Sequence, residues 1–159
     1  MFESIEKSKI SKRTVSRIFA VQALYTNDMY KNTLVDRESR EKLLFSYNDI
    51  FKELEEFEDY IQVGFSKNFY NKLLDNFFDN IDNVNKTIID NLQSNFFVET
   101  LGVMILSILK CGVTELLYMR DDKTVYNIIL SEYVKISKIF LNAREVKIIN
   151  AILGKIATL

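Results

Sequence analysis

The hydrophobic residues of this chain recur at intervals of three and four positions over most of its length. This is the spacing of one face of an α-helix. The pattern predicts about seven helices, over residues 11–27, 41–62, 67–92 (one or two helices), 99–119, 124–142 and from about 143 onward. Residues 1–10 are polar and are expected to form a flexible leader, ahead of a single all-helical domain over residues 11–159.

The first predicted helix carries two kinds of surface. Val15, Ile18 and Phe19 follow helical spacing and share a hydrophobic face. Arg13 and Arg17 lie four positions apart, on roughly the opposite side. We therefore expect this helix to pack one face against the core and to present a basic face to solvent.

Four residues are expected to mark helix ends. Ser11 and Thr124 precede hydrophobic periodic segments and can cap them through their hydroxyl groups. Gly64 is expected to break the second helix, and Asn142 is a possible stop before the last one.

Residues 99–119 are hydrophobic nearly all round, which is typical of a helix buried at the centre of a fold. Lys110 and Glu115 interrupt this segment, so each is expected to reach the surface or to find a partner. Cys111 is the single cysteine. A lone cysteine in a hydrophobic stretch is more often a packing residue than a nucleophile.

The composition narrows the fold and excludes several chemistries. The chain of 159 residues has no proline and four glycines, whereas β-sandwiches and barrels need frequent glycine and proline turns. It has no histidine, so histidine-based catalysis and the common zinc sites are excluded. The glycines are too scattered for a phosphate-binding loop, and the acidic segment 53–59 lacks a calcium-loop pattern. We expect no catalytic residue, no metal and no cofactor.

No signal peptide or membrane-spanning segment is evident, so a soluble cytoplasmic protein is expected.

Charge is unevenly distributed along the chain. Residues 1–30 carry five basic and three acidic side chains, and residues 101–159 carry eight basic and five acidic ones. Residues 31–100 hold eight basic and fourteen acidic side chains. If the two ends meet in space, they form a positive patch that can hold a polyanion.

Two stretches resemble a known family. Residues 11–28 read SKRTVSRIFAVQALYTND, with Ala-Val-Gln-Ala-Leu-Tyr at positions 20–25 after a basic start. Residues 108–157 contain ILKCGVTELLY, ILSEYVKISKIF and KIINAILGKIA in that order. These segments are similar to the first helix and to the three last helices of the bacterial transcription antitermination factor NusB family. The ordered set covers about 70 residues, and the middle of the chain matches only as helices of suitable length.

The resemblance implies an all-α fold of two packed helical bundles, NusB-like, and a non-enzymatic RNA-binding function. The implied partners are the boxA-type single-stranded RNA of ribosomal RNA operon transcripts and the ribosomal protein NusE. Other Nus factors and RNA polymerase would be reached indirectly. Matching positions nominate as RNA-binding residues Lys9, Lys12, Arg13, Arg17, Arg144 and Lys147.

Three polar residues on hydrophobic faces also match the family: Gln22, Glu132 and Asn150. A buried polar group needs hydrogen-bond partners, so we expect a structural role for each of them, and we expect Asn150 to be buried.

The sequence also departs from the family pattern. Where the family pattern has an arginine, this chain has Lys110, and where the pattern has a glycine, it has Ala151. The acidic residue common at the start of the family's last helix is Arg144 here. The basic N-terminal segment is reduced as well. An alternative is therefore a helical protein–protein adaptor or homodimer with weak RNA binding. An enzyme ranks last, because the chain has no room for the methyltransferase domain that follows some NusB-like domains.

Overall fold

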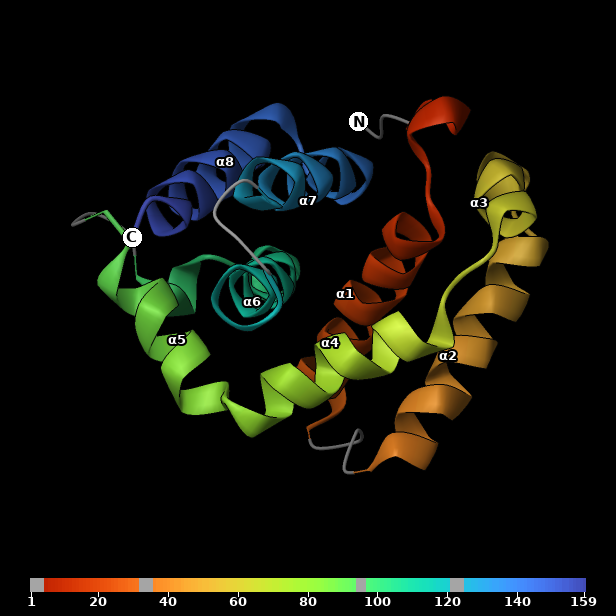
Figure 1. Cartoon of the computed structure of the whole chain (residues 1–159), viewed down its shortest axis with the longest axis horizontal. Coiled ribbons are helices and arrows are strands. Elements are labelled where there is room, and N and C mark those ends of the chain that lie inside the picture. The colour runs from red at the N-terminus through yellow and green to blue at the C-terminus, as the bar shows by residue number, and fades with distance from the viewer. Residues whose placement is uncertain (1–4, 32–35, 94–96, 121–124) are drawn as a thin grey trace.

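The computed structural model describes residues 5–31, 36–93, 97–120 and 125–159. Within these residues the chain forms α-helices and short 3₁₀-helices and no strand (Figure 1). The eight α-helices are α1 (Lys12–Tyr30), α2 (Arg37–Lys52), α3 (Glu58–Val63), α4 (Lys67–Asp79), α5 (Ile81–Asp90), α6 (Val103–Tyr118), α7 (Tyr126–Phe140) and α8 (Ala143–Ala157). The all-α fold expected from the sequence is confirmed for this part of the chain.

The helix count differs slightly from the prediction because the segment predicted as one helix over residues 41–62 is interrupted, while residues 67–92 form two helices, as the prediction allowed. Leu54 has an extended backbone (φ −108°, ψ 114°), which ends α2 and leads through a 3₁₀ turn into α3. The interruption brings Phe57 back onto Phe51, with ring centroids 4.1 Å apart. Asn80 also leaves the helical region, with φ −134° and ψ 28°, and separates α4 from α5.

Helix α1 lies at the centre of the fold. Helices α2, α4 and α6 pack around it, with further contacts from α3 and α7. Residues 14–21 of α1 are all buried, and so is Ala23; the small side chains of Ala20 and Ala23 let neighbouring helices approach closely. The predicted basic face is therefore wrong beyond the first turn. Lys12 and Arg13 are exposed, whereas Arg17 is buried.

Helix α6 is the second buried helix, as predicted. It packs against α1, α4, α5, α7 and α8. A Cβ atom at Gly112 would lie 2.9 Å from Leu153 Cδ1, so the close contact of α6 with α8 depends on the missing side chain. Cys111 is buried, and burial raises the pKa of its thiol. The Nζ atom of Lys110 lies 2.8 Å from Asp28 Oδ2, which confirms the expected pairing.

The helices form two packed groups. In Figure 1, α2 and α3 lie on one side of α1 and α4, while α5, α7 and α8 gather around α6. Contacts of α6 with α1 and α4 join the groups, and one hydrophobic core runs through both. As a result, the N-terminal end of α1 lies close to both α6 and α7.

The segment before α1 is part of the folded body. Ile5 and Ile10 are buried, and the backbone N–H of Ile5 donates to the hydroxyl of Tyr60 at 3.1 Å. The Nζ atom of Lys135 donates to the carbonyl of Lys9 at 3.2 Å. A flexible leader was expected over residues 1–10. Residues 5–10 instead pack on the helices, and residues 1–4 lie outside the described part of the chain.

Helix ends follow the sequence signals at several positions. The Ser11 hydroxyl accepts a hydrogen bond from the Thr14 N–H at 3.1 Å, which confirms the cap of α1. Gly64 ends α3 with a positive φ of 80°, a conformation that favours glycine. Asn142 caps the start of α8 rather than only stopping α7. Thr124 lies outside the described residues.

Candidate nucleic-acid interface

The exposed cations nearest to the N-terminal end of α1 are Lys9, Lys12 and Arg13, here called the α1 basic cluster. Lys12 and Arg13 form no ion pair with any described residue, and Lys9 has only a solvent-exposed pair with Glu6 at 3.8 Å. Such exposed pairs are weak. The first turn of α1 also leaves backbone N–H groups unpaired by the helix, which adds positive potential at the same place.

A cavity of about 370 Å³ opens beside this cluster. Lys9 and Arg13 line its mouth, Glu115 and Glu132 lie deeper, and Ile128 stands on its rim. Ile128 is 62% exposed. The cavity therefore combines cations with accessible hydrophobic surface.

Phe69 on α4 positions the arginine side chains of α1. The guanidinium carbon of Arg13 lies 5.0 Å from the centroid of the Phe69 ring, and that of Arg17 lies 4.9 Å from it. Stacking on the ring restricts the Arg13 side chain without neutralising its charge. Sequence reasoning missed Phe69, because nothing in the local pattern indicates which helix faces α1.

Arg17 was predicted to be an exposed RNA-binding residue, and its position in the structure contradicts this prediction. Only 5% of its surface is exposed. Its Nε and Nη2 atoms donate to the two carboxylate oxygens of Glu115 at 2.7 and 2.9 Å, and Nη1 donates to Glu132 at 2.8 Å. The side chain is thus committed to two buried carboxylates and does not reach the solvent as expected.

Burial by itself lowers the pKa of Arg17, because it disfavours the charged form. The hydrogen bonds and the negative charge of Glu115 outweigh this effect, so the pKa of Arg17 is raised overall. The guanidinium therefore stays charged inside the protein. Its role in this structure is to hold α1, α6 and α7 together.

Glu132 is the buried structural residue that the sequence suggested. It also accepts a hydrogen bond from the Thr14 hydroxyl at 2.6 Å and forms an ion pair with Lys135. Tyr133 donates its hydroxyl hydrogen to Glu115. Burial first, and then the charge of Glu115, raise the pKa of Tyr133 well above its ordinary value. Arg17, Lys135, Glu115 and Glu132 balance in charge and form what we call the buried ion network.

The other two structural polar residues differ from expectation. Asn150 is exposed, so the prediction that it is buried is wrong. Gln22 is half-buried, and its Oε1 atom is buried without a hydrogen-bond partner among the described residues. Its backbone carbonyl accepts from the Tyr47 hydroxyl at 3.2 Å.

Arg144 and Lys147 are exposed on α8, but they line a different cavity. That cavity measures about 430 Å³ and shares no lining residue with the one beside α1. The predicted RNA-binding residues therefore fall into two separate places, apart from the buried Arg17.

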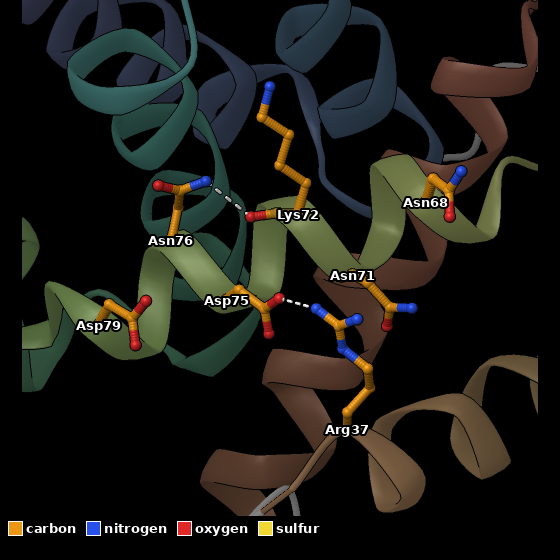
Figure 2. A pocket seen from close by; sticks show the side chains of 7 residues that line it. All are labelled: Arg37, Asn68, Asn71, Lys72, Asp75, Asn76 and Asp79. Atoms are coloured by element: carbon orange, nitrogen blue, oxygen red, sulfur yellow. Dashed lines mark hydrogen bonds and ion pairs between the residues drawn. The ribbon is translucent and has the colours of Figure 1, made fainter.

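Another cavity, of about 420 Å³, lies between α2 and α4 (Figure 2). It is lined by asparagines and by side chains of both charges: Arg37, Lys72, Asp75 and Asp79. Arg37 pairs with Asp75, as the dashed line in Figure 2 marks. Because its charges cancel, this cavity has no preference for a polyanion.

Two searches of the described residues were negative. None of their helices is both long and hydrophobic enough to cross a membrane. They also contain no group of three or more cysteine, aspartate or glutamate side chains arranged to hold a metal ion.

Comparison with known proteins gives one consistent result. The sequence profile of the NusB family matches residues 14–158. Transcription antitermination protein NusB of Rickettsia bellii is 28% identical over 153 residues, covering 96% of this chain and 94% of the relative. The protein of the same name from Rickettsia massiliae is 26% identical and covers 96% of both chains. With its all-helical fold and its matched length, this chain belongs to the NusB family.

Proposed function

We propose that this protein is a transcription antitermination factor that binds single-stranded RNA at the N-terminal end of α1. The observation that carries this proposal is the α1 basic cluster, which lies beside a cavity with accessible hydrophobic surface. It has three exposed cations, and two of them form no ion pair with a residue that the structure describes. The names of the family relatives support the antitermination role. In this role the protein acts by binding and catalyses no reaction.

The geometry suggests how such an RNA would be held. Lys12 and Arg13 contact phosphates, because both are exposed and available for a polyanion. Phe69 orders the Arg13 side chain beforehand, which reduces the conformational entropy lost on binding. An unstacked base enters the cavity against hydrophobic rim residues such as Ile128, since single-stranded RNA is bound through both phosphates and bases.

The resemblance to the NusB family supports finer assignments. The RNA is of boxA type, from transcripts of ribosomal RNA operons, and the protein partner is the ribosomal protein NusE. Other Nus factors and RNA polymerase are engaged through this complex, in the cytoplasm where transcripts are made. Arg17 supports the RNA site indirectly by fixing α1 against α6 and α7.

The proposal is tested by the double variant Lys12→Ala, Arg13→Ala. It should bind boxA-type RNA more weakly, and the dependence of log affinity on log salt should flatten by about 0.7 for each lost phosphate contact on a single strand. Its melting temperature should stay close to that of the unchanged protein, because exposed substitutions usually change stability by less than about 0.5 kcal/mol.

The matched control is Lys42→Ala, Lys52→Ala, which removes two exposed lysines from α2. It makes the same change in net charge away from the cavity, so it separates local contact from overall charge. If the two double variants lose RNA affinity equally, the α1 basic cluster is not the binding site.

A second candidate function is that of a protein–protein adaptor or homodimer with weak RNA binding. Helix α2 and its end expose hydrophobic side chains that favour it: Phe45, Ile50 and Leu54. Sedimentation of the unbound protein, together with its affinity for boxA-type RNA with and without NusE, distinguishes the two functions.

A further inference from the structure

The cavity on α8 is a groove that follows one side of the helix for almost its whole length. Six α8 residues line it, at spacings of three and four: Arg144, Lys147, Ile148, Ala151, Ile152 and Lys155. The stripe covers about 16 Å at the rise of an α-helix. Asn91 and Gln93, at the end of α5, form the opposite wall. Figure 1 shows the end of α5 beside α8. We call this cavity the α8 groove.

The charge of the α8 groove is of one sign. Arg144, Lys147 and Lys155 are exposed, and none of them forms an ion pair with a described residue. Among the described residues, no carboxylate lines the groove. By contrast, Arg37 in the cavity between α2 and α4 pairs with Asp75, which lines the same cavity. The charged residues in the described lining of the groove are therefore all basic and have no anion to complement them.

The floor of the groove is aliphatic. Ile152 is buried, Ile148 is half-buried, and Ala151 is exposed, so a shallow hydrophobic surface lies between the cations. The part of the lining that the structure describes contains no aromatic side chain. Binding of single-stranded nucleic acid commonly uses stacking of bases on aromatic groups, which these lining residues do not offer. An aliphatic side chain fits the floor better than a base does.

We propose that the α8 groove is a docking site for an acidic segment of a partner protein. The segment presents carboxylates to Arg144, Lys147 and Lys155 and places an aliphatic side chain on Ile148, Ala151 and Ile152. An amphipathic helix in a groove is a common form of such recognition, with side chains spaced like those of α8 itself. The amides of Asn91 and Gln93 supply polar contacts at the rim. This surface is separate from the α1 basic cluster and does not depend on RNA binding there.

The test uses the full chain, labelled with ¹⁵N, and a synthetic helical peptide that carries glutamate and leucine at helical spacing. The peptide should bind saturably, with amide shifts confined to α8 and the end of α5. Reversing two charges with Lys147→Glu, Lys155→Glu should weaken binding by about tenfold or more, since attraction becomes repulsion at two contacts. The control Lys138→Glu reverses one exposed lysine of α7 outside the groove and should leave binding unchanged.

A second variant separates shape from charge. Ala151→Arg adds a positive charge but fills the floor of the groove, and it should weaken binding because the aliphatic side chain loses its place. Ala151 is exposed, so the substitution leaves the core intact.

Three outcomes would overturn the proposal. In the first, the peptide does not bind, or it binds with shifts elsewhere. In the second, Ala151→Arg strengthens binding, which would indicate a charged surface without a groove. In the third, single-stranded RNA shifts the α8 resonances and displaces the peptide, and the groove then belongs to the RNA-binding surface. Loss of RNA binding in the α1 variants bears only on the proposed function.

Discussion

The first and second turns of α1 carry the same residue type in opposite environments. Arg13 is exposed, stacks on Phe69 and has no ion pair with a described residue. Arg17, one turn later, stacks on the same ring but is buried between Glu115 and Glu132. The two arginines lie on the same side of the helix and differ in depth, since α1 is exposed at Lys12 and Arg13 and buried over residues 14–21. Depth along the helix therefore separates a charge available to a ligand from one that stabilises the fold.

The largest effect is expected from Arg17→Ala. It leaves Glu115 and Glu132 buried with Lys135 as the remaining cation, and breaking a buried ion pair costs about 3–5 kcal/mol. Urea unfolding followed by circular dichroism measures the loss. Arg13→Ala is the control and should change stability by less than about 0.5 kcal/mol. Equal effects of the two substitutions would contradict the comparison.

A smaller effect is expected at alkaline pH from Tyr133→Phe. The pKa of Tyr133 is raised in the folded state, so its contribution to stability is complete below the unfolded value of about 10 and is lost above it. One such group lowers stability by about 1.4 kcal/mol for each pH unit beyond that point.

Tyr133→Phe should therefore lose stability less steeply above about pH 10 than the unchanged protein does. Urea unfolding across this range provides the measurement, with the exposed Tyr30→Phe as the control. An unchanged slope for Tyr133→Phe would show that this tyrosine ionises as easily in the folded state as in the unfolded one.

The smallest effect is expected from Asn150→Ala. Asn150 is exposed, so stability should change by less than about 0.5 kcal/mol. Asn71 provides a comparison of the same residue type, because it is buried and its Nδ2 atom donates to Glu41 at 3.0 Å. Asn71→Ala should cost about 1–3 kcal/mol by removing a hydrogen bond to a charged group, although Glu41 keeps its ion pair with Lys67. Thermal unfolding of the two variants shows whether the burial of the asparagine determines how much stability is lost.

Much of the fold could be predicted because helical periodicity is a local property. The central, fully hydrophobic α6 and the cap at Ser11 follow directly from neighbouring residues. The burial of Arg17 does not, because its partner Glu115 lies 98 positions away and on another helix. Neither residue's local pattern indicates the other.

Asn150 illustrates a different limit. The buried face of α8 is formed by Ile149, Ile152, Leu153 and Ile156. Successive residues turn by about 100° around a helix, so a position next to a core residue can lie at the edge of the buried face or outside it. Which edge is covered depends on how α6 and α7 approach α8, and the sequence of α8 alone does not determine this.

The buried thiol on α6 has a practical consequence. Cys111 is the single cysteine of the chain and lies among helices that contact α6 on several sides. A thiol-reactive dye reaches it only when these helices separate, so the folded state protects the thiol from modification. The rate of labelling therefore reports how often the helices around α6 separate, and no cysteine has to be introduced for the measurement.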